Sequence, residues 1–233
     1  MGLAHSPRIV TDGIVLALDA ANTKSYGGSG TTWIDISGKG NNATLTSMNG
    51  ANFDSANGGS FTFDGTSDYV AETASLSDTF WQGNWTASFW VNFDTLNTTT
   101  GGASDKILIH HGSSITRGGL HLVQRNSRIR FGLYADDLES TSTVSTGTWY
   151  NLVFALNNTS YAKAIYINGT LDSSHTGGGA YTGSGTNTKI GGKNLSFGTL
   201  FDGFMSFCSF YNRVLTAAEV KQNYNALRGR YGI

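Results

Sequence analysis

Hydrophobic and polar residues alternate along most of this chain with the period of two that is typical of β-strands. In the run SRIRFGL (127–133), Ile129, Phe131 and Leu133 share one face, and two arginines share the other. Residues 86–93 alternate in the same way. These patterns predict strands that bury one face in a core.

Three further apolar runs predict strands at 13–18, 152–156 and 164–167. The last run ends at Asn168-Gly169, a strong signal for a hairpin turn because both residues tolerate positive φ. Short strands separated by turns rich in Gly, Asn and Ser indicate an all-β fold. We predict a two-sheet antiparallel sandwich of the jelly-roll type.

One short helix is predicted at the C-terminal end, over about residues 216–228. Thr216 and Glu219 have the spacing of a capping box, in which each side chain bonds the other residue's backbone. Three apolar residues then recur at helical spacing: Val220, Tyr224 and Leu227.

The chain of 233 residues has no internal linker and no shift of composition, so we predict one domain over residues 13–233. Residues 1–12 have mixed polarity and include Pro7, and they are interpreted as an N-terminal arm. The tract 173–188 is rich in Gly, Ser and Thr and is expected to form a surface loop.

Charge changes the picture mainly by what it excludes. Only 13% of the residues are charged, against about 25% in an average domain, and the net charge is −1. This balance gives no electrostatic reason to expect nucleic acid or a membrane as a partner. No stretch approaches the ~20 apolar residues of a membrane helix, and the first residues lack the apolar core of a signal peptide. Cys208 is the only cysteine and lies between apolar neighbours, so we expect a buried, inert thiol.

Carboxylates are too few for an obvious glycosidase. That chemistry needs two carboxyl groups across the scissile bond. Asp137 and Glu139 are the candidate pair, but we expect them to be a solvated strand end that leads into a loop at 140–143. We therefore expect no enzymatic activity and no catalytic residues, and a glycoside hydrolase is the least favoured function.

Histidines and arginines offer two weaker signals. His110 and His111 are neighbours and point to opposite faces of a strand, so only one of them could join His121 at a metal, and two histidines are a weak zinc signal. We favour ordinary polar strand positions. Four arginines also lie close together in sequence and could bind an anionic glycan or a partner protein, although a solvated sheet face is favoured: Arg117, Arg125, Arg128 and Arg130.

The loop DISGKGNN (35–42) begins like a calcium loop. An EF-hand needs oxygen ligands where Lys39 and Thr46 stand, which excludes that motif. We predict a turn in which Asp35 and Ser37 bond their own backbone before a strand at 43–45. Calcium held by separate segments is the alternative, and four aspartates are available for it: Asp19, Asp64, Asp68 and Asp202.

Taken together, several segments resemble a concanavalin A-like lectin/glucanase domain of the laminin-G type. The segments that carry this resemblance are WIDISGKGNNATL (33–45), FTFDGTSDYV (61–70), FWV (89–91), WYNLV (149–153), YING (166–169), FDGF (201–204) and YNRVLT (211–216). They span nearly the whole chain in the order of the family. The resemblance implies the two-sheet antiparallel jelly roll.

One departure from the family concerns metal binding. Relatives commonly carry an Asp-Glu pair just before the Tyr-Asn-Arg segment, and here residues 206–208 are Ser-Phe-Cys. The resemblance places Asp19 where some relatives hold structural calcium, and Asp202 is retained. These two aspartates are the candidate metal ligands. No cofactor is otherwise expected, and the sequence assigns no ligand-binding residues.

Both ends of the chain are similar to proteins of tailed bacteriophages of the cyanophage kind. The similar segments are residues 1–26 and 211–233. This resemblance implies a non-enzymatic structural protein of the virion surface, as a capsid decoration or a tail or fibre component, assembled in the host cytoplasm. Its expected partners are other virion proteins, further copies of itself and glycans of the host surface. A free carbohydrate-binding, lectin-like module is the alternative.

Overall fold

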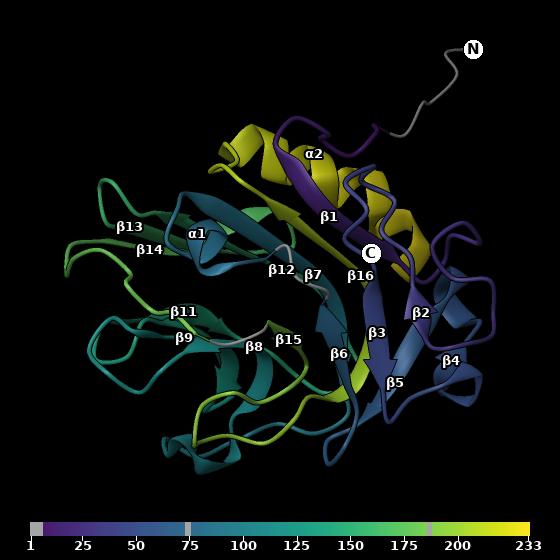
Figure 1. Cartoon of the computed structure of the whole chain (residues 1–233), viewed down its shortest axis with the longest axis horizontal. Coiled ribbons are helices and arrows are strands. Elements are labelled where there is room, and N and C mark those ends of the chain that lie inside the picture. Colours follow the sequence, from purple (N-terminus) through teal and green to yellow (C-terminus); the bar gives the residue numbers. More distant parts are fainter. Residues whose placement is uncertain (1–6, 73–75, 186–187) are drawn as a thin grey trace.

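Two antiparallel β-sheets face each other and enclose the core, as the alternation of residues predicts (Figure 1). The structure is a computed structural model that describes residues 7–72, 76–185 and 188–233. Every pairing between its named strands is antiparallel within those ranges. The all-β sandwich with one short C-terminal helix is therefore confirmed.

Sheet A has the order β14-β13-β12-β7-β16-β5-β4, and β1 also pairs with β16. Its strands are β1 (Ile14–Asp19), β4 (Phe53–Asp54), β5 (Ser60–Asp64), β7 (Trp85–Phe93), β12 (Trp149–Asn157), β13 (Ala162–Ile167), β14 (Thr170–Thr176) and β16 (Asp202–Tyr211).

Sheet B has the order β11-β10-β9-β8-β15-β6-β3-β2. Its strands are β2 (Thr32–Trp33), β3 (Ala43–Thr46), β6 (Tyr69–Glu72), β8 (Lys106–Gly112), β9 (Gly119–Arg125), β10 (Arg128–Gly132), β11 (Asp137–Thr143) and β15 (Lys189–Ile190).

Helical segments are short and lie outside the two sheets. They are α1 (Asp78–Trp81), α2 (Ala217–Leu227) and the 3-10 turns η1 (Gly50–Asn52), η2 (Ala56–Gly58), η3 (Gly102–Ser104) and η4 (Arg228–Tyr231). The predicted capping box is present, because Thr216 accepts from the backbone of Glu219 and the Glu219 carboxylate accepts in return. No helix in the described part of the chain is long and apolar enough to cross a membrane.

The core between the sheets is rich in aromatic side chains. Ile129, Phe131 and Leu133 point into it, as their alternation predicts. Phe131 packs edge-on against Phe154 of the opposite sheet, with ring centroids 5.9 Å apart. Burial of each such side chain contributes about 1.5–3 kcal/mol, so this face of the strands fixes how the sheets stack.

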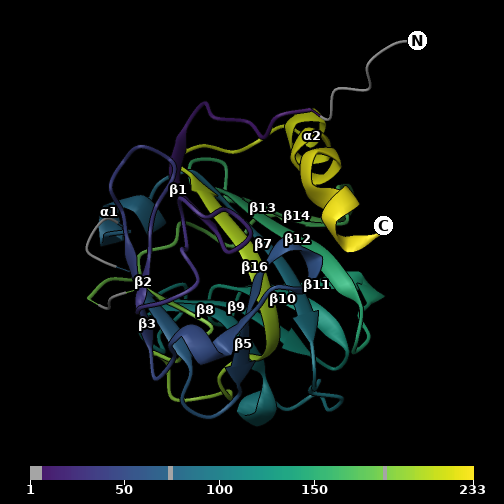
Figure 2. The ribbon, with the colours of Figure 1, turned by 90° about the vertical axis from the view of Figure 1, so that its right-hand side faces the viewer.

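The outer face of sheet A is covered by α2 and by the described part of the N-terminal arm (Figure 2). Trp90 stacks on Tyr224 and Tyr231, with ring centroids 5.7 and 4.1 Å apart. The Val10 amide donates to Asn223 Oδ1 over 2.7 Å, so the arm and the helix are packed together. Residues 1–6 of the predicted arm lie outside the described residues.

One predicted loop is a strand, and the first residues of another are a strand, while its described residues 177–185 form a loop as predicted. Residues 140–143 belong to β11, where pairing with β10 and hydrogen bonds from the amides of Thr141 and Ser142 to Asp172 offset the lack of apolar residues. Residues 173–176 of the predicted surface loop belong to β14, which pairs with β13. Backbone pairing with a neighbour outweighs weak local propensity at both places.

The loop 35–42 is a turn held by one carboxylate. Asp35 is buried and accepts hydrogen bonds from the amides of Ala17, Ser37 and Asn41, at 2.8–2.9 Å. It also accepts from the Ser37 hydroxyl. These bonds confirm the predicted turn before β3. Both carboxylate oxygens of Asp35 accept hydrogen bonds within the protein.

Candidate functional site

Four residues, which we call the histidine row, lie side by side across the outer face of sheet B. His110 on β8 is aligned with His121 on β9, His121 with Gly132 on β10, and Gly132 with Asp137 on β11. Their neighbours Leu120, Leu122 and Phe131 point the other way, into the core. The register of four strands thus brings together side chains that are as much as 27 positions apart in the chain.

The His121 ring crosses over Gly132 to reach Asp137. Its Nε2 lies 3.2 Å from Asp137 Oδ1, and its Nδ1 lies 3.1 Å from the carbonyl oxygen of Gly119. Both partners are acceptors, so the two bonds exist together when the ring carries two protons. Gly132 makes room for this, because a Cβ there would lie 1.8 Å from Nε2.

Asp137 is held as a carboxylate. Burial would raise its pKa, but the hydrogen bond from His121 and the contact with Arg130 outweigh burial and lower the pKa to about 2. Arg130 donates to Asp137 over 2.9 Å and to Glu139 over 3.2 Å. The two predicted carboxylates are therefore bound to the same arginine and are not solvated freely.

His110 is fully buried beside His121 and beneath Phe197. Its Nδ1 accepts from the amide of Leu195 over 3.3 Å. Burial, and then the nearby charges of His121 and Lys193, lower its pKa to about 3, so this ring is neutral near pH 7. The Phe197 ring covers both histidines, with centroids 4.9 Å from His110 and 5.2 Å from His121.

Arg125 lies on the same strand and the same face as His121. Its Nε and Nη2 donate to the buried carboxylate of Asp105, at 2.5–3.0 Å. Gly102 leaves space for the guanidinium, because a Cβ there would lie 2.5 Å from Nη2. The pairing fixes the guanidinium plane and uses neither hydrogen of Nη1.

The turn between β10 and β11 is strained where it borders the site. Tyr134 and Ala135 have φ of 53° and 64°, a left-handed conformation that costs roughly 1–2 kcal/mol per residue without glycine. The Leu133 amide bonds Asp136 across the turn, and the Arg117 amide bonds Tyr134. Strain held in place by such contacts is frequent at functional sites.

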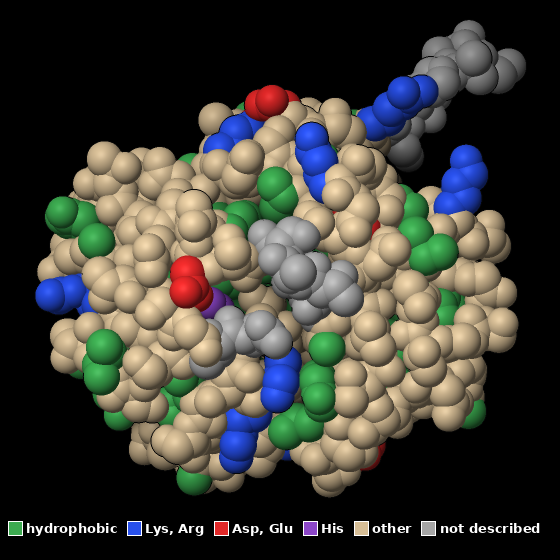
Figure 3. All heavy atoms as spheres, in the orientation of Figure 1, with side chains coloured by type: hydrophobic (Ala, Val, Ile, Leu, Met, Phe, Trp, Pro, Cys, Tyr) green, Lys and Arg blue, Asp and Glu red, His purple; other side chains and the backbone are tan. Residues whose placement is uncertain are grey.

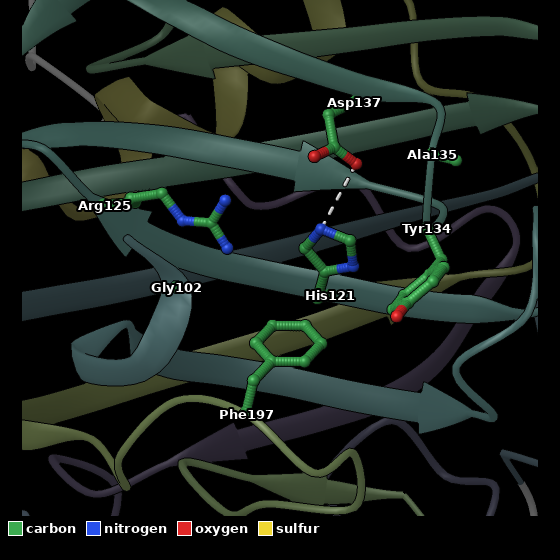
Figure 4. A pocket seen from close by; sticks show the side chains of 7 residues that line it. All are labelled: Gly102, His121, Arg125, Tyr134, Ala135, Asp137 and Phe197. Atoms are coloured by element: carbon green, nitrogen blue, oxygen red, sulfur yellow. Dashed lines mark ion pairs between the residues drawn. The ribbon is translucent and has the colours of Figure 1, made fainter. Parts of the chain in front are cut away.

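These elements enclose an open pocket of about 180 Å³ (Figure 4). In this view His121 lies at the centre, with Phe197 below it, Tyr134 to its right, Asp137 above it and Arg125 to its left. The lining residues are Gly102, His121, Arg125, Tyr134, Ala135, Asp137 and Phe197. A small number of polar groups among aromatic rings is typical of a small-molecule site.

The remaining candidates lie elsewhere. Arg128 donates to the carbonyl oxygen of Ser140. His111 points to the opposite side of its strand from His110, as predicted, and contacts Tyr181 at 2.7 Å and Asp78 at 3.2 Å. All three histidines lie on strands, as predicted, and all three are buried.

The two candidate metal ligands do not share a site. Asp19 forms a two-bond ion pair with Arg230, at 2.8 and 3.0 Å. Asp202 lies 3.8 Å from the ammonium group of Lys106. Asp19 is aligned with Phe207, five residues along β16 from Asp202, which separates the two backbones by about 16 Å. No three His, Cys, Asp or Glu side chains gather as a metal site within the described ranges.

Cys208 is buried, as predicted, and burial raises the pKa of its thiol. Phe197 and Tyr134 were not predicted as site residues. Neither belongs to a motif, and only the folded register brings them to the histidine row.

Comparison with known proteins agrees with the fold. The sequence profile described as the concanavalin A-like lectin/glucanases superfamily matches residues 63–221, more than half of the chain. No curated protein sequence matches the chain.

Several solved structures are similar in shape. Domain 4 of AbnA, an extracellular arabinanase of Geobacillus stearothermophilus solved with arabinotriose, superposes with a TM-score of 0.64 and 18% identity, over 91% of this chain and 98% of that one. Trypanosoma rangeli sialidase with sialic acid gives a TM-score of 0.63 and 18% identity over 97% of this chain. The receptor-binding domain of botulinum neurotoxin type G gives 0.61 and 17% over 91%.

The chain spans about a third of the sialidase (36%) and about half of the toxin domain (51%). At these identities the likeness concerns the fold alone.

Proposed function

Because this chain belongs to the concanavalin A-like lectin/glucanases superfamily, we propose that it is a non-enzymatic carbohydrate-binding domain. The observation that carries the proposal is the pocket on the outer face of sheet B, which Phe197 and Tyr134 line on adjoining sides. Aromatic faces suit the apolar CH groups of a sugar, and fixed charged groups suit its hydroxyls. Domain 4 of the arabinanase, which shares this fold, was solved with arabinotriose, and this supports the ligand class.

The charges in the pocket support binding without hydrolysis. A glycosidase needs one carboxyl group that is protonated near neutral pH, so its pKa must be raised. The pKa of Asp137 is instead lowered to about 2, and Arg130 holds both Asp137 and Glu139. The lowered pKa of Asp137 therefore argues against this residue as a general acid.

A glycan array probed with the whole chain tests the function. Phe197→Ala removes one aromatic wall and is expected to abolish the signal. Tyr161→Ala is the matched control, because Tyr161 is an exposed aromatic residue that does not line the pocket. An array without signal for the unmodified chain would refute the proposal. Equal signals for the two variants would show that the glycan binds outside this pocket.

As the setting of this domain we propose the surface of a tailed-phage virion, where it is a capsid decoration or a tail or fibre component. The support is the resemblance of residues 1–26 and 211–233 to phage proteins. The described parts of both ends pack together on sheet A, where Gln222 also donates to the Arg8 carbonyl oxygen. The pocket lies on the other sheet, so docking through the ends would leave it facing outward.

In this setting the partners are other virion proteins and further copies of the chain. The face in Figure 3 carries only scattered charged side chains, which agrees with contacts that do not depend on a strong surface charge. Deletion of residues 1–12 is expected to reduce incorporation into particles while glycan binding is retained. Unchanged incorporation would show that the arm does not dock the domain.

A further inference from the structure

We infer that the pocket holds one neutral sugar residue by two adjacent hydroxyl groups, one accepting from Arg125 and the other donating to Asp137. This inference rests on the proposed carbohydrate binding and names the ligand class of the same site. It follows from a fixed donor, a fixed acceptor, the lack of surplus positive charge and the size of the space.

The donor is Arg125 Nη1. Nε and Nη2 are taken by the carboxylate of Asp105, which is 0% exposed, and the Arg125 side chain is only 14% exposed. The guanidinium is therefore held in one orientation before any ligand arrives. A preorganised donor loses little conformational freedom on binding, so more of the hydrogen-bond energy appears as affinity.

The acceptor is the carboxylate of Asp137. One oxygen faces His121 Nε2 and the other accepts from Arg130 Nη1. A carboxylate offers about four lone-pair sites, so each oxygen can accept one further hydrogen bond. Since the group stays ionised, it can accept from a sugar hydroxyl but cannot donate.

Charge decides between neutral and acidic sugars. The cations Arg125 and Arg130 face the anions Asp105, Asp137 and Glu139. These cations do not outnumber the anions, so the pocket offers no surplus positive charge for a carboxylate. An acidic sugar would also be desolvated beside Asp137, which is unfavourable for like charges.

Size decides between one sugar and a chain. The pocket is open to solvent and measures about 180 Å³. We assign this space to one sugar ring. The Phe197 and Tyr134 rings have centroids 6.5 Å apart and close its sides, so further sugars of a glycan would extend into solvent.

The test is an NMR titration of the isotope-labelled whole chain with methyl glycosides of neutral hexoses, with methyl glucuronide and N-acetylneuraminic acid as acidic probes. We expect shifts at the pocket residues with neutral glycosides and weaker binding of the acidic probes. For the neutral glycoside that binds best, single-deoxy analogues are expected to lose about tenfold in affinity at two adjacent positions only.

Two variants address the two ends of the diol. Asp137→Asn removes the charged acceptor, and Arg125→Lys keeps one charge for Asp105 but removes the guanidinium fork; each is expected to weaken binding about tenfold. Asp12→Asn is the control, since it removes a carboxylate that is 85% exposed and lies outside the pocket. Thermal unfolding of each variant establishes that it is folded.

The outcomes separate this inference from the proposed function. Tighter binding of the acidic probes, or neutral binding that is unaffected by both variants, would overturn the inference while carbohydrate binding stands. No binding of any glycan on the array or in solution would remove the proposed function, and the inference with it.

Discussion

At the residue scale, the candidate site depends on residue 132 being a glycine. Gly132 has no positive φ, so alanine is compatible with its backbone. Its Cβ would nevertheless lie 1.8 Å from His121 Nε2 and 2.5 Å from Asp137 Oδ1. Gly132→Ala is therefore expected to displace the ring and to lower the free energy of unfolding by about 1–3 kcal/mol, measured by urea denaturation.

Gly27→Ala is the matched control. No atom lies within 4 Å of a Cβ at this position and its φ is not positive, so a change within about 0.5 kcal/mol is expected. If Gly132→Ala changed the free energy of unfolding as little as this control, the His121 ring would have another way to reach Asp137, and the histidine row would not be rigid.

His110 makes stability depend on pH. Its pKa is about 3 in the folded chain, because burial and the charges of His121 and Lys193 oppose protonation, and about 6.5 when unfolded. Between these values the unfolded chain binds a proton that the folded chain does not. Stability from this group is therefore complete above pH 6.5 and falls by about 1.4 kcal/mol per pH unit as the pH drops toward 3.

Urea denaturation at pH 7.5, 6.5 and 5 measures this slope. His110→Gln is expected to flatten it, while His175→Gln, at an exposed position, is expected to leave it unchanged. The explanation fails if the His110 variant keeps the full slope, since another buried group such as His111, whose pKa burial also lowers, would then account for it.

At the element scale, an aromatic stack helps to attach the C-terminal segment to sheet A. Tyr231 of η4 lies 4.1 Å from Trp90 and 4.7 Å from Trp149, measured between ring centroids. Tyr231→Ala opens a cavity over the outer face of sheet A and is expected to cost about 3–5 kcal/mol in thermal or urea unfolding. Tyr231→Phe keeps the ring and is expected to cost less than about 1.5 kcal/mol. Equal losses would show that the hydroxyl group, not the stack, attaches the segment.

Elements with local signals could be predicted from the sequence, and elements without them could not. The alternation of Ile129 and Phe131 and the capping box at Thr216 act within a few residues, and both are confirmed. Residues 140–143 have no apolar alternation, so the sequence does not mark them as a strand. Pairing with β10 and hydrogen bonds to Asp172 hold this edge strand in place. The Tyr134-Ala135 turn lacks the Gly or Asn that marks such turns.

The candidate site shows the same limit. Sequence analysis selected Asp137, His121 and Arg125 for separate reasons and favoured a plain surface role for each. What joins them is the register of β8 to β11, and a shift of one residue would send every side chain to the other face. Register depends on pairing between strands, so neither the row nor its cover by Phe197 is visible in the sequence.

At the scale of the whole molecule, the two sheets are joined by a buried ion pair. Lys163 on β13 of sheet A extends to Asp136 in the turn before β11 of sheet B. Its ammonium group donates to the carboxylate and to the carbonyl oxygen of Asp136, both over 2.6 Å. The side chains are 1% and 9% exposed, so the pair is withdrawn from water.

The ion pair is expected to matter most when it is broken on one side. Lys163→Met leaves the Asp136 carboxylate buried without its cation and is expected to cost about 3–5 kcal/mol in urea unfolding. Adding Asp136→Asn removes the unpaired charge, so the double variant is expected to recover most of that loss. The Asp136→Asn single variant completes the cycle. If the double variant were as unstable as the sum of the singles, the two groups would act independently, and the ion pair would not be what joins the sheets at this end.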